Sequence, residues 1–381
     1  MSSHDFPAPA MVYLVATTGH PNYGDELIAA TWLKHLARIA PDSEVWLDCP
    51  NPGPSEVLLG HLHPNLRVTD TFWRLCWESP SDEPWETASF VQHAINNPGM
   101  APRWVAGIEM AARADLVHLI GGGFVNGIWP RHIGLLAAAA AAVRRSGGRA
   151  VMTGQGLCPM SDETQPLLRS LAAHFEIVDV RDEPSGSLLH SSRQVEYTGD
   201  DLFFGIEPGL FRTDDLRKVM VCLQSDLLDM SKPALAGFLL DTLHSWDTPP
   251  EQVGFVEGIP WVDRAVFTLV EHHLPGARFY PFSEIIDNGL PAAAGQLWLS
   301  TRFHMHLMAA AAGAQGVAVS INSGYYTNKH RSLLERGSGW ELSEGLRIPT
   351  PAPPDNGGFS PSALQDLQEG KIALARRIYG S

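Results

Sequence analysis

Short apolar runs rich in branched residues alternate with longer stretches of helical periodicity along most of the chain. Residues 12–16 and 116–120 are typical of buried strands, and residues 25–38 are typical of a helix that follows a strand. The alternation resumes near Arg217, after a break at Glu207-Pro208-Gly209. Strands that alternate with helices usually form parallel sheets with helices on both faces. The pattern therefore predicts an α/β protein made of two Rossmann-like domains that face a cleft.

The predicted elements divide the chain near its middle. We expect a first domain over residues 1–210, a second over 211–348, and a linker with a C-terminal helix over 349–381. That helix could pack back on the first domain. The expected strands are residues 12–16, 116–120, 150–153, 177–180, 219–223, 252–256, 297–299 and 317–320. The expected helices are residues 25–38, 133–145, 164–174, 232–244, 261–273, 302–312 and 362–379.

Residues 50–102 do not fit this alternation. They are rich in proline, tryptophan and acidic residues and show weak periodicity, which predicts an irregular insertion in the first domain that could be partly helical and could face the acceptor. Trp73, Trp77 and Trp85, with Trp104 just beyond, could stack on a sugar face. We favour the simpler interpretation, in which these tryptophans pack a small core beneath a long loop.

Composition and charge limit the partners. The 381 residues carry 27 Lys+Arg against 42 Asp+Glu, a formal net charge of −15, which argues against a nucleic-acid partner. The four cysteines lie far apart, as expected of free thiols in a reducing compartment. The apolar runs are too short for a signal peptide or a membrane span. The sequence therefore predicts a cytoplasmic protein with no integral membrane segment, and it is compatible with a homo-oligomer.

Three glycine-bearing loops follow predicted strands, where ligands of open α/β sheets bind. In the first, Asn22 or Asp25 could bind an acceptor hydroxyl, although an ordinary turn and helix cap would use the same residues. In the second, Gly121-Gly122-Gly123 offers successive backbone N–H groups to an anion, or forms a plain loop. The third loop is Gly154-Gln155-Gly156, which continues to Cys158. None of the three is a dinucleotide fingerprint or a P-loop.

Cationic side chains follow other strands. Arg302 could hold a carboxylate or phosphate through two parallel hydrogen bonds, and His304 could transfer a proton near neutral pH. A capping arginine and a buried histidine would explain either residue taken alone. His306 is two residues from His304, so the two do not share a helix face and a metal pair is not expected. Lys329, in the loop after Tyr325, and Arg181, after another strand, add positive charge.

Six segments, taken in order along the chain, resemble the motifs of the polysaccharide pyruvyltransferase family. They are Asn22-Tyr23-Gly24-Asp25-Glu26, Gly121-Gly122-Gly123, Gly154-Gln155-Gly156 with Pro159, Val180-Arg181-Asp182 with Ser185, Thr198-Gly199-Asp200-Asp201, and Arg302-Phe303-His304. The resemblance extends from about residue 13 to residue 331. It implies a fold similar to that of the two-domain GT-B glycosyltransferases. It also implies transfer of a pyruvyl group from phosphoenolpyruvate to two hydroxyls of one sugar in a glycan or glycolipid precursor, which gives a ketal.

The resemblance assigns roles residue by residue. Arg302 and His304 match the family's Arg-x-His pair and Arg181 its mid-chain Arg-Asp motif, so these residues would hold phosphoenolpyruvate and His304 would also act as acid and base. The predicted site is then His304 and Arg302 for catalysis; Arg181, Arg302, Lys329, Gly122, Gly123 and Gln155 for the donor; and Asn22, Asp25 and Tyr325 for the acceptor. Neither a metal nor a cofactor is expected, because phosphoenolpyruvate is a co-substrate.

Three other functions compete with this interpretation. A GT-B glycosyltransferase that uses a nucleotide sugar would need an acidic residue for the ribose, and Glu257 or Glu284 could serve. A non-catalytic sugar- or phosphate-binding protein would be expected to lose the Arg-x-His pair, which is intact here. A dinucleotide oxidoreductase is disfavoured because its glycine fingerprint is absent.

Overall fold

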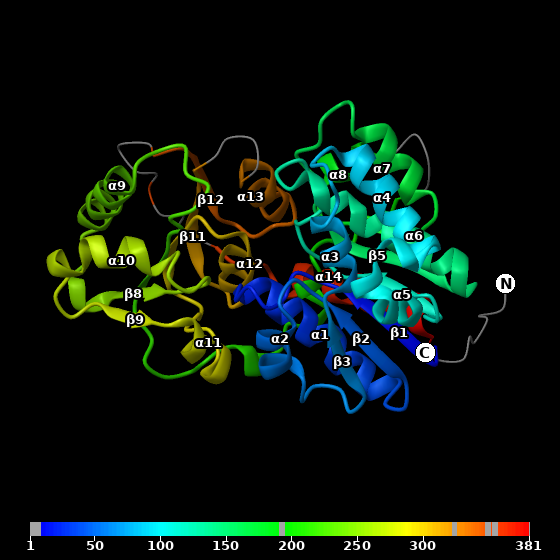
Figure 1. The fold of residues 1–381 in the computed structure, drawn as a ribbon. Coiled ribbons are helices and arrows are strands. Elements are labelled where there is room, and N and C mark those ends of the chain that lie inside the picture. Colours follow the sequence, from blue (N-terminus) through cyan, green and yellow to red (C-terminus); the bar gives the residue numbers. More distant parts are fainter. Residues whose placement is uncertain (1–8, 190–194, 322–325, 347–351, 353–356, 381) are drawn as a thin grey trace. The chain divides into compact units, whose positions relative to one another are not determined.

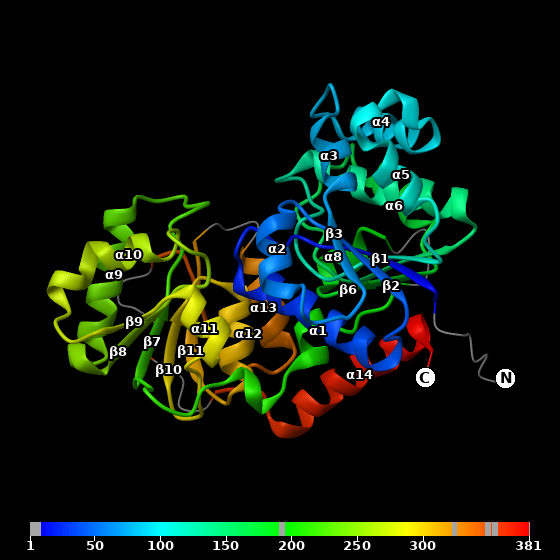
Figure 2. The same ribbon diagram turned by 60° about the horizontal axis from the view of Figure 1, so that its bottom comes forward.

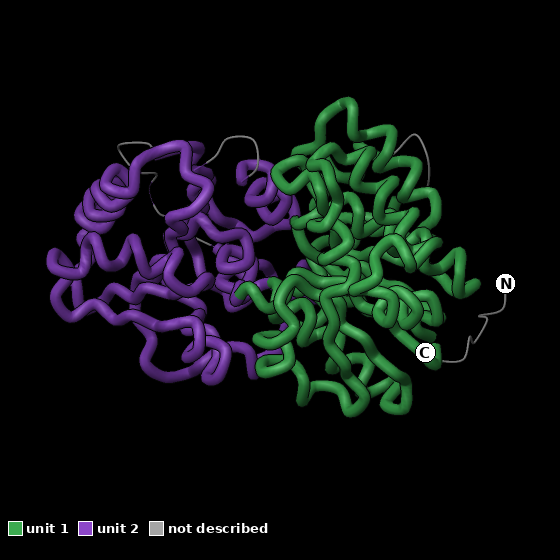
Figure 3. The backbone as a smooth tube through the Cα atoms, viewed as in Figure 1, with its two compact units in different colours: residues 1–20, 25–205, 367–381 green, residues 21–24, 206–366 purple. Residues whose placement is uncertain are grey.

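The chain forms two compact units. The computed structural model describes residues 9–189, 195–321, 326–346, 352 and 357–380. Unit 1 contains residues 1–20, 25–205 and 367–381, and unit 2 contains residues 21–24 and 206–366 (Figure 3). Each unit is built on its own sheet, and the strands and helices are labelled in Figure 1.

Unit 1 contains a six-stranded parallel sheet in the order β3-β2-β1-β4-β5-β6. Its strands are β1 (Met11–Val15), β2 (Glu44–Asp48), β3 (Leu66–Thr69), β4 (Leu116–Leu119), β5 (Arg149–Gln155) and β6 (Ile177–Val180). The central strand β1 is buried along its whole length, with Val12 in register with Val45 on one side and Leu116 on the other. Burial on both faces is why its sequence is continuously apolar rather than alternating.

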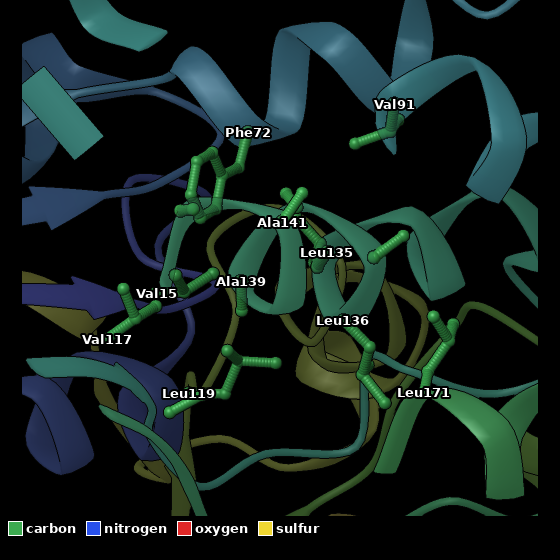
Figure 4. Close-up of a cluster of buried hydrophobic side chains, with 14 of the residues drawn as sticks. Val15, Phe72, Val91, Val117, Leu119, Leu135, Leu136, Ala139, Ala141 and Leu171 are labelled. Carbon is green, nitrogen blue, oxygen red and sulfur yellow. The ribbon is translucent and has the colours of Figure 1, made fainter. Parts of the chain in front are cut away.

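Helices surround this sheet. They are α1 (Tyr23–Ile39), α2 (Pro52–Leu59), α3 (Thr71–Trp77), α4 (Pro84–Asn96), α5 (Val105–Ala111), α6 (Ile133–Ser146), α7 (Gln165–Ala172), α8 (Glu183–Ser187) and α14 (Pro361–Tyr379). The first two residues of α1 belong to unit 2, as do the first six of α14. The alanine-rich α6 lies between the sheet and α3 and α4, and its small side chains allow a close approach from both sides (Figure 4). Val15, Val117 and Leu119 of the sheet contribute to the same core as Leu135 of α6.

The expectation of an irregular insertion over residues 50–102 was wrong, and only its partly helical character is confirmed. This stretch forms α2, the edge strand β3, α3 and α4. The sequence pattern is weak because β3 is only partly buried and two of the helices have eight residues or fewer. Trp73 is buried, donates a hydrogen bond from Nε1 to the carbonyl of Ala16 and packs against Trp77 and Phe124, so its role is packing.

Unit 2 contains a second six-stranded parallel sheet, in the order β12-β11-β10-β7-β8-β9. Its strands are β7 (Val219–Cys222), β8 (Val253–Val256), β9 (Arg278–Tyr280), β10 (Leu297–Ser300), β11 (Gln315–Ser320) and β12 (Glu341–Glu344). Its helices are α9 (Lys232–Ser245), α10 (Arg264–Val270), α11 (Phe282–Asn288), α12 (Phe303–Ala311) and α13 (Tyr326–Glu335). The predicted fold class, two parallel α/β sheets, is confirmed.

The C-terminal helix α14 packs on unit 1, as the sequence suggested (Figure 2). The Nζ of Lys371 lies 2.8 Å from Asp179 Oδ2 and 2.7 Å from Asp201 Oδ1, and all three side chains are fully buried. Near the end of the helix, the hydroxyl of Tyr379 lies 2.7 Å from His118 Nδ1. Within the described residues, no helix combines the length and the apolar character needed to cross a membrane.

Candidate functional site

Arg302 lies in unit 2, between the end of β10 and the first turn of α12. Its backbone N–H donates to Ser300 Oγ at 3.0 Å, which fixes the turn from strand to helix. Its guanidinium donates from Nε and Nη2 to Asp263 Oδ1 at 3.0 and 2.7 Å, and from Nη2 to Asp226 Oδ1 at 3.1 Å. No described residue accepts a hydrogen bond from Nη1, so this side of the guanidinium can receive an anion.

Asp263 anchors this arginine and was missed by the sequence analysis. Its side chain is buried, and Oδ2 accepts backbone N–H bonds from Gly258 and Ile259, both at 2.9 Å. Burial raises the pKa of Asp263, and the charge of Arg302 opposes this effect. Burial likewise disfavours the charged form of Arg302, but Asp263 and Asp226 outweigh it and raise the pKa of Arg302. The arginine is therefore held charged and in a fixed orientation.

His304 lies two residues after Arg302, in the first turn of α12, and packs on Gly24. A Cβ added at Gly24 would lie 1.8 Å from His304 Nδ1, so the imidazole fills the space that a side chain would need. The backbone N–H of the preceding residue, Tyr23, donates to the carbonyl of Gly258 at 2.9 Å. Two sequence motifs far apart in the chain therefore meet in unit 2, and the loop at Gly258 connects both of them to Asp263.

His306 points into the core and not toward His304. It is fully buried and stacked on Trp340, with ring centroids 4.3 Å apart. Its Nδ1 lies 3.1 Å from Nδ1 of His330, and its Nε2 lies 2.9 Å from Ser338 Oγ. Burial lowers the pKa of His306 and lowers that of His330 to about 4, so both rings are neutral at pH 7. His306 thus connects α12 to His330, Ser338 and Trp340 in the core of unit 2.

Lys329 and Tyr326 lie on α13 of the same unit. The Nζ of Lys329 is 5.3 Å from the centroid of the Tyr326 ring, a cation–π distance. The Tyr326 hydroxyl accepts a hydrogen bond from Gln224 Nε2 at 2.7 Å. Burial raises the pKa of Tyr326, and the charge of Arg302 opposes this rise. Tyr325, one of the three predicted acceptor residues, lies outside the described residues.

Arg181 belongs to unit 1, where it follows β6. Its Nη1 lies 3.4 Å from Asp200 Oδ2 and its Nε 3.7 Å from Asp182 Oδ2, and the side chain is buried. A Cβ at Gly156 would lie 2.6 Å from Arg181 Nε, so this glycine makes room for the guanidinium. The Arg-Asp, Gly-Gln-Gly and Asp-Asp motifs therefore converge on Arg181.

The triple-glycine loop of unit 1 binds a carboxylate of the protein itself. The N–H of Gly121 donates to Asp201 Oδ2 at 2.8 Å, and the Gly122 carbonyl accepts from the N–H of Gly156 at 2.9 Å. Gln155 is fully buried, and its Nε2 donates to the carbonyls of residues 119, 120 and 153. These contacts are structural; a donor contact by Gly122, Gly123 or Gln155 stays a prediction.

The loop after β1 contains the predicted acceptor residues. The side-chain oxygen of Asn22 accepts the N–H of Gly24 at 3.2 Å, which is the turn that the simpler interpretation expected. Asn22 belongs to unit 2 and Asp25 to unit 1. The next residue, Glu26, is buried and accepts the N–H of Gly19 at 2.8 Å through Oε1, while no described residue bonds to Oε2. Burial raises the pKa of Glu26 to about 8.

The arrangement around Arg302 and His304 suits acid–base chemistry on an anion. A fixed guanidinium orients a carboxylate or phosphate through paired hydrogen bonds, and an adjacent imidazole can give and take a proton. Within the described part of the chain, no group of three histidine, cysteine, aspartate or glutamate side chains is placed to hold a metal ion.

Solved structures share the fold at low sequence identity. A UDP-N-acetylglucosamine 2-epimerase is 11% identical with a TM-score of 0.56, covering 98% of this chain and 95% of that chain. The UDP-GlcNAc 2-epimerase from Neisseria meningitidis bound to UDP-GlcNAc is 10% identical with a TM-score of 0.50, covering 97% and 93%. Phytolacca americana UGT2, complexed with UDP-2fluoro-glucose and pterostilbene, is 10% identical with a TM-score of 0.50, covering 99% and 91%. The fold is therefore GT-B-like.

The sequence profile of one family covers most of the chain. No curated protein matches the sequence. The profile described as polysaccharide pyruvyl transferase matches residues 22–323, from the Asn22 turn through the Arg302 and His304 pair. The protein is thus a transferase-family member, and it belongs to the polysaccharide pyruvyl transferase family.

Proposed function

We propose that this protein transfers a pyruvyl group from phosphoenolpyruvate to two hydroxyls of one sugar and forms a pyruvate ketal. The observation that carries the proposal is the anchored Arg302 guanidinium two residues before His304, whose imidazole is seated on Gly24. Membership of the family supplies the class of reaction. The donor would bind through Arg302, with Lys329 of the same unit as a further cationic contact; a donor contact by Arg181 stays a prediction.

The proposed reaction needs one acid and two deprotonated hydroxyls. His304, as imidazolium, protonates the methylene carbon of phosphoenolpyruvate, and the carbon that bears the phosphate gains oxocarbenium character. One sugar hydroxyl adds to that carbon and gives its proton back to His304. The C–O bond to phosphate then breaks, the second hydroxyl of the same sugar adds, and its proton leaves with the phosphate. The products are the cyclic ketal and inorganic phosphate, and the balance requires no oxidant or reductant.

The charges around Arg302 favour a donor whose anionic group replaces Asp226 as a partner of the guanidinium. Asp263 and Asp226 together offset the single positive charge of the arginine. The Asp226 side chain is 41% exposed and makes one contact to Arg302, whereas Asp263 is buried and makes two. A donor carboxylate or phosphate would take the Nη1 side and compete with Asp226, while Asp263 keeps the arginine in place.

The nucleotide-sugar alternative gains no support from its candidate ribose ligands. The Glu257 carboxylate accepts the backbone N–H groups of Trp261 and Phe282 at 3.0 and 3.1 Å. The Glu284 carboxylate pairs with Arg212 and Arg278 at 2.7 and 2.6 Å. Both acidic side chains are therefore used within unit 2.

Calorimetric titration tests the proposal. Wild type is expected to bind phosphoenolpyruvate, and Arg302→Ala to lose at least about tenfold in affinity, because a hydrogen bond to a charged group contributes about 1.5–3 kcal/mol. Incubation with phosphoenolpyruvate and a panel of methyl hexosides should release phosphate and give a product heavier by one pyruvyl ketal. Binding of UDP without binding of phosphoenolpyruvate would overturn the proposal in favour of a nucleotide-sugar enzyme.

A further inference from the structure

Two large apolar side chains of unit 2 are held at the surface by a backbone conformation that such residues rarely adopt. Leu227 has φ 49° and Trp261 has φ 67°, and the two are 41% and 79% exposed. Among the described residues, the other non-glycine positions with positive φ are Asp215 and Asp247, and aspartate tolerates this region better. For a bulky side chain the left-handed region is strained, and it persists only where the surrounding structure enforces it.

The surrounding structure holds the loop that contains Trp261 in this conformation. It connects β8 to α10, and two buried carboxylates hold it in place. Glu257 accepts the backbone N–H of Trp261 at 3.0 Å, and Asp263 accepts those of Gly258 and Ile259, each at 2.9 Å. These hydrogen bonds fix the backbone at Trp261, although the exposed Trp261 side chain contributes little to the core.

Both strained residues neighbour the carboxylates that hold Arg302. Leu227 directly follows Asp226, and Trp261 precedes Asp263 by two residues. These two carboxylates bind the same guanidinium from the loops after adjacent strands, β7 and β8. The exposed apolar pair is thus attached to the two loops that meet at Arg302.

The surface formed by Trp261 and Leu227 fits a sugar ring better than a protein or lipid surface. A pyranose presents an apolar face of C–H groups and a polar edge of hydroxyls, and aromatic side chains bind such mixed surfaces. The apolar part consists of two side chains. The Arg264 guanidinium lies 5.8 Å from the centroid of the Trp261 ring, and Leu227 follows Asp226, which pairs with Arg302. Asp226 Oδ2 has no hydrogen-bond partner among the described residues, so it can accept a bond from a hydroxyl.

We propose that Trp261 and Leu227 form the pyranoside subsite of this protein. The Trp261 ring stacks on the C–H face of the sugar, Leu227 contacts the edge of the ring, and Asp226 Oδ2 accepts a hydrogen bond from a sugar hydroxyl. The identification of this sugar as the pyruvyl acceptor rests on the proposed function. Binding of the pyranoside itself does not, and the two can be tested separately.

Saturation-transfer NMR with methyl β-galactopyranoside, methyl β-glucopyranoside and methyl α-mannopyranoside tests the subsite without turnover. At least one hexoside should receive saturation on its ring protons in wild type, and the signal should fall about 3- to 10-fold in Trp261→Gly. Trp261→Phe, which keeps an aromatic face, should restore most of it. Leu227→Gly should give a smaller loss. Trp85→Ala is the matched control, because Trp85 is a 51% exposed tryptophan of unit 1.

Thermal unfolding separates binding from structure. Glycine adopts positive φ without strain, so Trp261→Gly and Leu227→Gly should unfold at a temperature no lower than that of wild type. Melting several degrees lower, with hexoside binding retained, would overturn the proposal and make the side chains structural. Absence of saturation transfer to all three hexosides in wild type would overturn it as well. Saturation transfer to the uracil protons of UDP, and not to the hexosides, would indicate instead that Trp261 stacks on a nucleobase.

The outcomes also distinguish the subsite from the proposed function. Hexoside binding that depends on Trp261, in a protein that does not turn over phosphoenolpyruvate, would support the subsite and reject pyruvyl transfer. Ketal formation with the same hexoside KM in wild type and Trp261→Gly would reject the subsite and leave pyruvyl transfer standing.

Discussion

The imidazole of His304 occupies the space in which any side chain at position 24 would stand. A Cβ at Gly24 would approach His304 Nδ1 to 1.8 Å, which no small shift can absorb. Gly24→Ala should therefore displace the imidazole and lower kcat by about 100-fold or more, the usual contribution of a positioned acid–base group. Steady-state kinetics with phosphoenolpyruvate measure the effect.

Gly237→Ala is the matched control for this substitution. Gly237 lies within α9 of the same unit, and a Cβ there would meet no atom within 4 Å. Alanine favours a helix interior over glycine, so this variant should be as active as wild type and slightly more stable. Equal kcat in Gly24→Ala and Gly237→Ala would show that the seat of His304 on Gly24 has no catalytic importance.

His304 and His306 should respond differently to the same substitution. His304→Gln should lower kcat by about 10²–10⁴-fold and leave the melting temperature near that of wild type. His306→Gln removes a buried ring that bonds to His330 and Ser338 and stacks on Trp340, so it should lower the free energy of unfolding by about 1–3 kcal/mol. Kinetics per folded molecule, with calorimetry alongside, separate the two. Full activity of His304→Gln would contradict its assignment as acid and base.

Asp263 and Asp226 should affect donor affinity in opposite directions. Asp263→Asn loses the negative charge and one of the two acceptor oxygens that hold Arg302 and the Gly258 loop, so the KM for phosphoenolpyruvate should rise about tenfold or more. Asp226→Asn removes a partly exposed anion that competes with the donor, so the same KM should fall about two- to threefold. The effect of Asp226→Asn should shrink at high ionic strength, because an exposed charge is screened. A rise in KM for both variants would show that the arginine needs both carboxylates.

Arg302 and His304 could be proposed as candidate site residues from the sequence because both lie in one short motif after a strand. Their partners could not. Asp263 and Asp226 are 39 and 76 residues away from Arg302 along the chain, and an isolated aspartate in a loop has no distinctive pattern. The triple-glycine loop shows the same limit, since the backbone N–H of Gly121, which could hold a ligand anion, donates to Asp201 here. Only the fold shows which carboxylate reaches these groups.

The helices and strands that could be predicted from the sequence are those whose burial requires apolar or small residues. The continuously apolar β1, the fully buried β4 and the alanine-rich α6 stand out because each is buried on nearly every side. The strands β2, β3, β9 and β12 were missed. Both β2 and β3 are only partly buried, β9 has three residues, and β12 reads Glu-Leu-Ser-Glu. Pairing with a neighbour, rather than local preference, makes such short edge segments into strands.

Lys371 should contribute far more to stability than the exposed arginine of the same helix. It is fully buried between Asp179 and Asp201, so Lys371→Met leaves two buried carboxylates without their cation and should cost about 3–5 kcal/mol. Arg377, 57% exposed, pairs with Glu196, and Arg377→Ala should cost about 1 kcal/mol or less. Urea unfolding followed by circular dichroism measures both. Equal losses would mean that α14 is held mainly by its apolar contacts.

Glu26 should make the protein less stable as the pH rises. Burial raises the pKa of its carboxyl to about 8 in the folded protein, against an ordinary value of 4.5 when unfolded. Between these two values the folded state binds the proton more tightly, so the stabilising contribution is complete below pH 4.5 and is lost as the pH rises through 8. Glu26→Gln keeps the shape of the protonated side chain and its bond to the N–H of Gly19. Between pH 6 and pH 9 the free energy of unfolding should therefore fall more steeply in wild type than in Glu26→Gln, by at most about 1.4 kcal/mol for each pH unit crossed. Parallel slopes for the two proteins would show that the carboxylate is already charged at pH 6.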